Sequence, residues 1–202
     1  MIKTTLITLI FVLTPFFGIS RNLLTETAEK IASAPSVSTR FEASNQTGKV
    51  SGEAVIANKC FVIITDGGDY ETWFDGKTQW TYNAATEEVS MTEPTMQEIL
   101  EVNPLAMITN LSSAYSISQI GTSDSVRQKF RLTPTSSNSS IKTAIVTINT
   151  TLLWPVEISA TLADNETLTI KFTDTAVGQK VSSDRFRYNP NLHPDAEIID
   201  LR

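Results

Sequence analysis

The chain has 202 residues, enough for one domain with a sizeable core. Its formal net charge of −6 argues against nucleic acid as a partner, because phosphate recognition needs clustered Lys and Arg. With a single histidine and a single cysteine, no pair of nucleophile and base is readable, which argues against an enzyme. We therefore expect a protein that is not an enzyme and that uses no metal ion or other cofactor.

The start of the chain has the pattern of a secretory signal peptide. Lys3 supplies a positive charge, and the mostly apolar run at 4–17 is too short to span a bilayer comfortably. Gly-Ile-Ser at 18–20 offers small residues at the −3 and −1 positions of a cleavage site. We predict that residues 1–20 are cleaved and that residues 21–202 form a single domain. An uncleaved membrane anchor is the alternative.

The mature chain begins with one predicted helix followed by a series of strands. Residues 22–33 have the period of an amphipathic helix, because Leu24, Ala28 and Ile31 fall on one stripe before Pro35. After it, apolar and polar residues alternate, as in strands with one apolar face. The strands predicted in this part are 36–44, 49–57, 61–65, 70–74, 79–83 and 87–91.

Asp75-Gly76 is the strongest turn signal in this series, because glycine tolerates the positive φ that tight hairpin turns need. After the turn, Trp80 and Tyr82 alternate with polar residues. This pattern predicts a hairpin that presents large aromatic side chains on one face. Ordinary core packing explains such aromatics as well as a binding site does.

A second helical segment is predicted at about 95–110, in the middle of the strands. Thr95 and Glu98 have the spacing of a capping box, and Asn103-Pro104 interrupts the helix. The segment is rich in methionine, which adapts well to irregular surfaces. Its apolar residues are Met96, Ile99, Leu100, Leu105, Met107, Ile108 and Leu111.

The second half of the chain is almost entirely strand-like. The predicted strands are 115–120, 126–132, 143–149, 154–162, 168–172 and 186–188. Their regular spacing indicates an antiparallel meander, and each has one apolar face that must be buried. A sandwich, a closed barrel, and a curved sheet with helices across its hollow side would all achieve this. The strand pattern alone leaves the three open.

The two residues of reactive type have plain structural explanations. Cys60 precedes an apolar run, so we expect a buried and inert thiol, with an intermolecular disulfide as the alternative. His193 lies near the end of the chain beside Pro194, where we expect it to be exposed to solvent. Neither residue indicates catalysis.

The hairpin motif carries a family resemblance. Asp-Gly-Lys-Thr at 75–78, followed by Trp80, Tyr82 and Asn83, resembles the outer-membrane lipoprotein carrier proteins of the LolA type. The similarity extends over nearly the whole mature chain, because further motifs follow in the family's order. These motifs are at 36–41, 52–63, 103–108, 130–134 and 186–190.

The resemblance implies an α+β fold, an incomplete antiparallel β-barrel (half-barrel) with helices covering its concave apolar face. It also implies a monomeric periplasmic carrier whose partners are acylated lipoproteins, an inner-membrane lipoprotein-releasing transporter and an outer-membrane acceptor. Shielding is needed because each exposed CH₂ of an acyl chain costs about 0.8 kcal/mol in water. A periplasmic sensor module that reads a lipid or a hydrophobic protein segment on the same half-barrel is the alternative.

Predicted site residues follow from the apolar faces and the resemblance together. Many carriers of this family latch the lid with an Arg in the second hairpin, but the matching position here is Ala57 or Asn58. The predicted lipid-binding cavity residues are Phe41, Phe61, Ile63, Trp80, Tyr82, Phe130 and Ile158. The predicted lid residues are Met96, Ile99, Leu100, Met107 and Ile108.

Overall fold

The computed structural model describes residues 23–109 and 114–202, so the predicted signal peptide, residues 1–20, lies outside the described residues. The helices are α1 (Leu23–Ser33), α2 (Met96–Val102), α3 (Pro104–Thr109) and the 3-10 turn η1 (Ser183–Phe186). The strands are β1 (Ser36–Ser44), β2 (Lys49–Ala57), β3 (Cys60–Thr65), β4 (Tyr70–Phe74), β5 (Gln79–Asn83), β6 (Glu88–Thr92), β7 (Tyr115–Asp124), β8 (Arg127–Pro134), β9 (Ile141–Asn149), β10 (Trp154–Leu162), β11 (Thr167–Gly178) and β12 (Glu197–Asp200).

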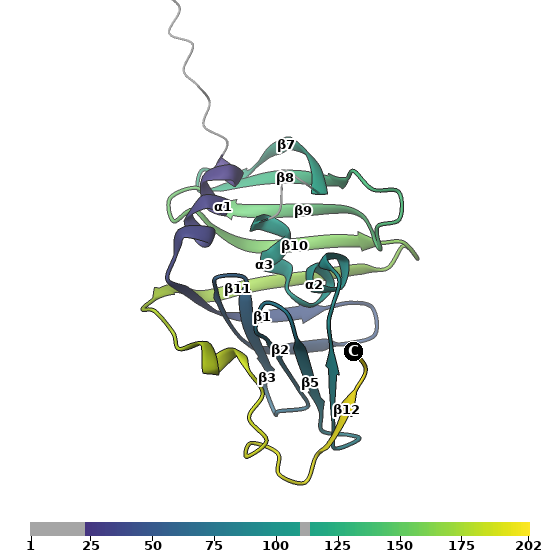
Figure 1. Cartoon of the computed structure of the whole chain (residues 1–202). Helices are drawn as coiled ribbons and strands as arrows, with labels where there is room; N and C mark the ends of the chain where they lie inside the picture. The colour runs from purple at the N-terminus through teal and green to yellow at the C-terminus, as the bar shows by residue number, and fades with distance from the viewer. Residues whose placement is uncertain (1–22, 110–113) are drawn as a thin grey trace, which may run out of the picture.

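These strands form a single 12-stranded sheet in the order β12-β6-β5-β4-β3-β2-β1-β11-β10-β9-β8-β7. Neighbouring strands are antiparallel, except that β12 runs parallel to β6. The sheet curves, and α1, α2 and α3 lie across the side that it encloses (Figure 1). The predicted half-barrel with helices over its hollow side is therefore confirmed, and a sandwich of two sheets is excluded.

Local hydrogen bonds define where α2 begins and where it passes into α3. The predicted capping box is confirmed, because the Thr95 N–H donates to Glu98 Oε2 at 2.7 Å and Thr95 Oγ1 accepts from the Glu98 N–H. At the end of α2, Asn103 Oδ1 accepts a hydrogen bond of 3.1 Å from the Leu105 N–H. This bond leads the chain from α2 directly into α3, with only Asn103 between the two short helices.

The main core lies between the helices and the half of the sheet from β7 to β11. It contains Leu24 and Ile31 of α1, Ile108 of α3, Val146 of β9 and Ile158 of β10, all of them buried. Because side chains alternate between the two faces of a strand, every second residue points to this core, and in these strands that residue is mostly apolar. The hollow is therefore apolar along this half of the sheet.

A second core lies on the outer face of the sheet, over β3 to β6. Val62, Trp73 and Val89 come from the strands, and Phe186 and Tyr188 come from the chain that follows β11. We call residues 179–202 the C-terminal segment. It runs from β11 through η1 and ends beside β6 (Figure 1). The segment thus covers an apolar outer face that would otherwise be in water.

The structure corrects the predicted strand at 186–188. Phe186 ends η1 and Tyr188 lies in irregular chain, although both are buried. Their alternation reflects two rings packing on the outer face rather than pairing within the sheet. The strand near the end of the chain is instead β12, which the sequence did not indicate because only four residues pair with β6.

The structure also corrects the expectation that His193 is exposed. Its ring stacks on Tyr82 with centroids 3.6 Å apart, and its side chain is only 20% exposed. Nε2 lies 3.4 Å from Glu71 Oε1, and the Tyr188 hydroxyl donates to the His193 carbonyl at 3.2 Å. His193 is therefore part of the packing that holds the C-terminal segment to the outer face.

Candidate ligand-binding cavity

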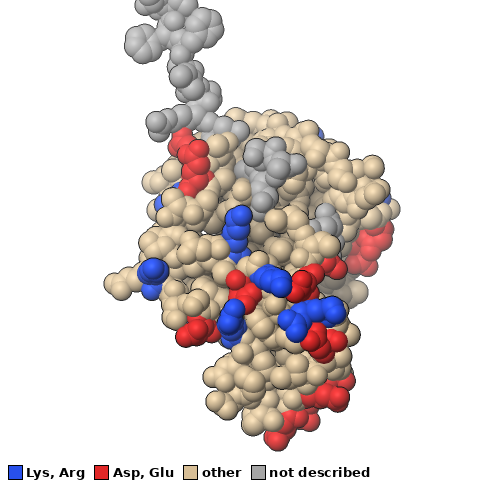
Figure 2. Space-filling view, in the orientation of Figure 1, with Lys and Arg blue, Asp and Glu red and all other residues tan. Residues whose placement is uncertain are grey.

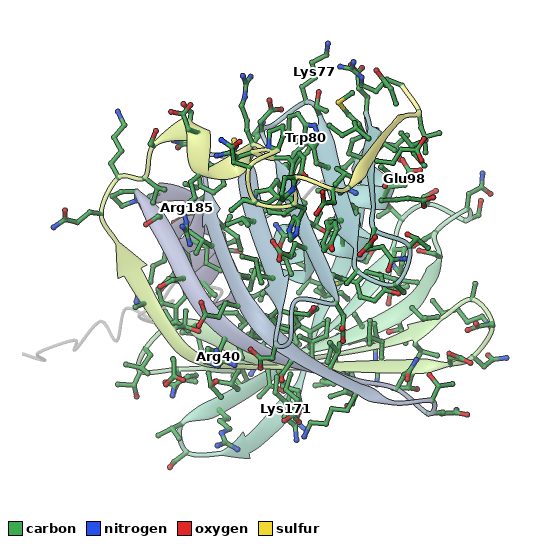
Figure 3. The ribbon with its side chains drawn as sticks, turned by 90° about the horizontal axis from the view of Figure 1, so that it is seen from below. Arg40, Lys77, Trp80, Glu98, Lys171 and Arg185 are labelled. Carbon is green, nitrogen blue, oxygen red and sulfur yellow. The ribbon has the colours of Figure 1, made fainter. Side chains whose placement is uncertain are left out.

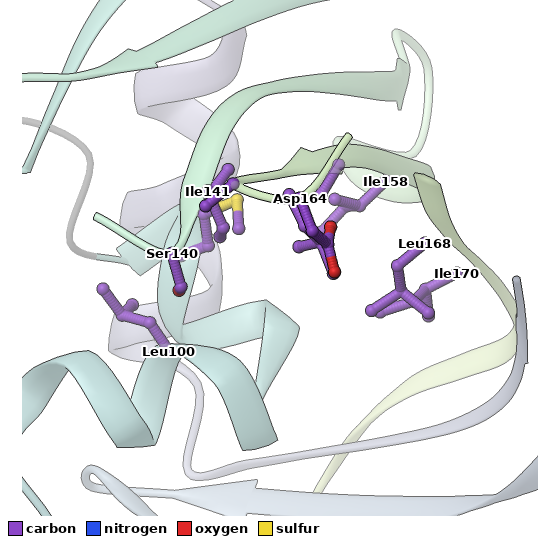
Figure 4. A pocket seen from close by; sticks show the side chains of 11 residues that line it. Leu100, Ser140, Ile141, Ile158, Asp164, Leu168 and Ile170 are labelled. Carbon is purple, nitrogen blue, oxygen red and sulfur yellow. The ribbon is translucent and has the colours of Figure 1, made fainter. Parts of the chain in front are cut away.

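The larger cavity of the hollow side has a volume of about 390 Å³ (Figure 4). Leu100 of α2 and Met107 of α3 form one wall, and the opposite wall comes from β9, β10 and β11. Most of the lining side chains are apolar, and polar groups occur at its rim. The lining residues are Leu100, Met107, Ser140, Ile141, Ile158, Ala160, Leu162, Ala163, Asp164, Leu168 and Ile170.

A smaller cavity of about 160 Å³ adjoins the larger one, since Leu168 and Ile170 line both. It lies between the junction of α2 with α3 and the strands β1, β2, β3 and β11. Its lining residues are Phe41, Ala43, Ala54, Ile63, Val102, Asn103, Leu105, Leu168, Ile170 and Phe172. Together the two cavities provide an apolar space along the underside of α2 and α3.

One wall of the smaller cavity depends on a glycine. Phe41 pairs with Gly52 on the neighbouring strand, and a Cβ at position 52 would lie 2.9 Å from Phe41 Cζ. The same Cβ would also collide with the carbonyl oxygen of Ile64. Because residue 52 has no side chain, the Phe41 ring can occupy the space beside it and still line the cavity.

The predicted cavity residues divide into three groups. Ile158 lines the larger cavity, and Phe41 and Ile63 line the smaller one. Phe61 and Phe130 are buried, with 0% and 3% exposed, but they line neither cavity. They belong to the packed layer around the hollow rather than to its open space.

Trp80 and Tyr82, the third group, lie on the opposite face of the sheet. Both pack against the second core, Trp80 lies next to the C-terminal segment (Figure 3), and Tyr82 stacks on His193 of that segment. Trp80 pairs with Trp73, so both rings project from the outer face, while Gln79 and Thr81 project toward the hollow. The prediction that Trp80 and Tyr82 line the cavity is therefore wrong. The physical reason is that the C-terminal segment supplies a second apolar environment on the outside.

Of the predicted lid residues, Leu100 and Met107 line the larger cavity. Ile108 is fully buried beneath the helices, Ile99 is half-buried, and Met96 is 53% exposed. The structure therefore brings Leu100, Met107 and the strand residue Ile158 together around one space. Ile99 and Met96 lie farther out on the same short helix.

Several lining residues were not selected from the sequence. Ala160, Leu168, Ile170 and Phe172 lie on apolar strand faces that the alternation had identified. Their faces were readable, but nothing in the pattern indicates which members meet open space and which meet other side chains. Asp164 carried no signal at all, because a polar turn residue is ordinarily explained by the turn itself.

Acidic and basic side chains lie beside one another on the face shown in Figure 2. The turn of the β4–β5 hairpin takes part in two charge pairs. Asp75 pairs with Arg187 at 3.0 Å, and Lys77 pairs with Glu93 at 3.1 Å. Burial alone would raise the pKa of Asp75, but hydrogen bonds from the Thr78 and Lys77 N–H groups, together with Arg187, hold this pKa below its usual value. The β4–β5 hairpin is thus attached to the C-terminal segment by a charge pair.

Cys60 lies near this hairpin turn and is half-buried rather than fully buried. Burial, and then the nearby negative charge of Asp75, raise the pKa of its thiol. The thiol is therefore held in its protonated, less nucleophilic form.

Across 23–109 and 114–202, no group of three or more His, Cys, Asp or Glu side chains is arranged to hold a metal ion. No helix within those ranges has both the length and the apolar character needed to cross a membrane.

Solved structures with the same fold have little sequence identity to this chain. An uncharacterised conserved protein from Thermus thermophilus superposes with a TM-score of 0.58 and 10% identity, covering 88% of this chain and 96% of that one. A DUF1329 family protein from Desulfovibrio piger gives a TM-score of 0.51 and 9% identity, over 82% and 95% of the two chains. At these identities the likeness shows the fold alone.

A third structure with this fold contains a protein partner. In the MucA/MucB complex of Pseudomonas aeruginosa, the matching chain has a TM-score of 0.50 and 14% identity. The alignment covers 83% of this chain and 60% of that one. This likeness, too, shows the fold alone.

Sequence comparison identifies the family. No curated protein matches the chain. The family model described as outer membrane lipoprotein carrier protein LolA, however, matches residues 18–161. This range is well over half of the chain, and it includes β1 to β9, the covering helices and most of β10. The protein therefore belongs to the LolA-like family of outer membrane lipoprotein carrier proteins.

Proposed function

We propose that this protein is a periplasmic carrier that binds the acyl chains of lipoproteins in the cavity beneath α2 and α3. It receives its cargo from an inner-membrane lipoprotein-releasing transporter and passes it to an outer-membrane acceptor. The observation that carries the proposal is the apolar cavity of about 390 Å³ between Leu100, Met107 and Ile158. Family membership supports an acylated lipoprotein as the cargo.

The cavity suits an acyl chain on physical grounds. Its volume falls within the range of about 300–1,000 Å³ that is common for small-molecule sites. A cavity lined by residues such as Leu100, Ile158 and Ile170 has few polar partners for water, so an apolar ligand can enter without displacing well-bound solvent. Each CH₂ that leaves water then contributes about 0.8 kcal/mol to binding.

The two helices that cover the cavity, α2 and α3, are short and only partly held by packing. α2 has seven residues and α3 has six, and isolated helices of this length are marginal in water. Ile99 is only half-buried, so the outer turn of α2 has less packing to lose when it lifts than the fully buried Ile108. Opening the hollow therefore requires displacing α2 while Ile108 of α3 keeps its packing.

A cavity-filling substitution tests the proposal. Ala160 lines the larger cavity and is 5% exposed, so the ring in Ala160→Phe would occupy the space of the ligand. We expect the affinity for an acylated peptide, measured by titration, to fall by about tenfold or more. The matched control is Ala176→Phe, which places the same ring at an exposed position of β11 and should leave affinity unchanged. Equal affinities for the two variants would contradict the proposal.

A second candidate is a module that binds a hydrophobic protein segment and acts as a sensor. The observation in its favour is that MucB, which has the same fold, forms a complex with the protein MucA. The same titration separates the two functions when it is repeated with an unacylated hydrophobic peptide. A carrier should bind only the acylated peptide, whereas a sensor of protein segments should bind both.

A further inference from the structure

A single charged residue, Asp164, lies among the described residues that line the two cavities. It is located in the turn between β10 and β11, at the rim of the larger cavity, where its carboxylate faces the space beside Ile158 and Leu168 (Figure 4). Asp164 itself is exposed to solvent. The apolar cavity therefore has a negatively charged rim on one side.

Hydrogen bonds fix the turn that carries this carboxylate. The Ala163 N–H donates to the Ser140 carbonyl at 2.7 Å, which joins the turn to the chain before β9. Asp164 Oδ1 accepts the Glu166 N–H at 2.9 Å within the turn. The position of the carboxylate relative to the cavity is thus set by the backbone, not by a freely moving side chain.

The lysine that contacts this turn bonds to Asn165 and not to Asp164. Lys142 Nζ donates to Asn165 Oδ1 at 2.6 Å, on the neighbouring residue of the turn. No ion pair to Asp164 occurs among the residues that the structure describes. Asp164 therefore presents a negative charge without an ion-pair partner, among the described residues, to a head group at the rim.

We propose that Asp164 sets the head-group selectivity of the cavity, which takes amphiphiles with an uncharged or cationic head group and discriminates against anionic ones. The inference rests on the proposed function, in which an acyl chain occupies the cavity. With the chain between Leu100 and Ile158, a head group at this rim lies close to the carboxylate. Like charges at such short range repel, and the repulsion weakens as salt is added.

Three surfactants with the same decyl chain provide the test: decyltrimethylammonium, decyl maltoside and decyl sulfate. Their affinities are measured by displacement of a hydrophobic dye from the full mature protein, at low and at high salt. For the wild-type protein at low salt, we expect decyltrimethylammonium to bind about fivefold more tightly than decyl sulfate. The affinity of decyl maltoside should lie between these two, and high salt should reduce the difference in affinity between the cationic and the anionic surfactant.

The variant is Asp164→Asn, whose side-chain oxygen can still accept the Glu166 N–H. Its matched control is Asp174→Asn, at an exposed position of β11 with a positive φ that asparagine tolerates well. Both variants change the net charge equally. We expect the gap between the cationic and anionic surfactants to close to within about twofold in Asp164→Asn and to persist in Asp174→Asn.

The outcomes separate the inference from the function on which it rests. If decyl maltoside binds but the gap survives in Asp164→Asn, the selectivity comes from the overall charge of the protein and the inference is overturned. If decyl maltoside does not bind to any variant, the proposed function fails as well. Closure of the gap in Asp164→Asn alone supports the assignment.

Discussion

Ile99 and Ile108 carry the same side chain on the two covering helices but differ in burial. Ile99 is half-buried on α2, whereas Ile108 is 0% exposed on α3. A charge placed at a fully buried position must be desolvated, while a charge at a half-buried position can turn toward water. The same charged substitution at the two positions therefore distinguishes a helix that can move from one that is part of the packed core.

We expect Ile99→Glu to lower the free energy of unfolding by no more than about 1 kcal/mol and to weaken binding of an acylated peptide. Ile108→Glu should cost several kcal/mol, because the carboxylate would be buried without a partner. A thermal melt and a binding titration on each variant measure the two effects. A large loss of melting temperature in Ile99→Glu, with unchanged affinity of the folded fraction, would show that α2 belongs to the core.

The β4–β5 hairpin has the turn conformation that its local sequence predicts. Gly76 has a φ of +97°, as the Asp-Gly turn predicts, and Asp75 Oδ1 accepts hydrogen bonds from the N–H groups of Lys77 and Thr78. Arg187 forms an ion pair with the other carboxylate oxygen, Asp75 Oδ2, at 3.0 Å. The turn could be predicted because all its determinants except Arg187 lie within four residues.

The lowered pKa of Asp75 predicts how the stability of the protein depends on pH. The folded pKa of Asp75 lies below its ordinary value of 3.8, so the carboxylate stabilises the fold above that pH, and this stabilisation is lost as pH falls through the folded pKa. Asp75→Asn keeps an acceptor for the two N–H groups but cannot titrate. We therefore expect its melting temperature to fall less than that of the wild-type protein between neutral pH and about pH 3.

Asp69→Asn, in the exposed loop before β4, is the matched control for this experiment. Its acid-induced loss of melting temperature should equal that of the wild-type protein. An Asp75→Asn variant that loses stability in acid as steeply as the control would show that other carboxylates dominate the acid response.

For the molecule as a whole, the sheet has two independent apolar environments, one on each face. The hollow side holds the cavity, and the outer core packs Trp73 against Tyr188 with ring centroids 5.3 Å apart. Damage to the outer core should therefore reduce stability without changing the cavity.

Tyr188→Ala tests this separation. Removing a buried aromatic ring typically costs about 3–5 kcal/mol, so we expect a clear fall in melting temperature and a red shift in tryptophan fluorescence as Trp73 becomes hydrated. Affinity for an acylated peptide should not change while the protein is folded. Leu192→Ala, in the same segment but 54% exposed, should leave both measurements near wild type. A parallel loss of affinity in Tyr188→Ala would mean that the two faces are coupled.

The sequence alone determined the covering helices, the capping box at Thr95 and most strands, since these depend on neighbouring residues and on periods of 3.6 and 2. It also determined, through the family resemblance, that the sheet is a half-barrel. Alternation showed correctly that Trp80 and Tyr82 share one buried face. The helices, the capping box and the strand alternation are local features, and nothing in the tertiary structure overrides them.

Only the tertiary structure decided which side of the sheet each apolar face occupies. A strand's alternation is symmetric, so it cannot distinguish the hollow from the outer face. The choice at Trp80 and Tyr82 depends on Tyr188 and His193, which are more than 100 residues away in the chain. The position of Asp164 at the cavity rim depends in the same way on how β10 and β11 meet α2 and α3. Such long-range contacts arise from packing the whole chain, and no local pattern encodes them.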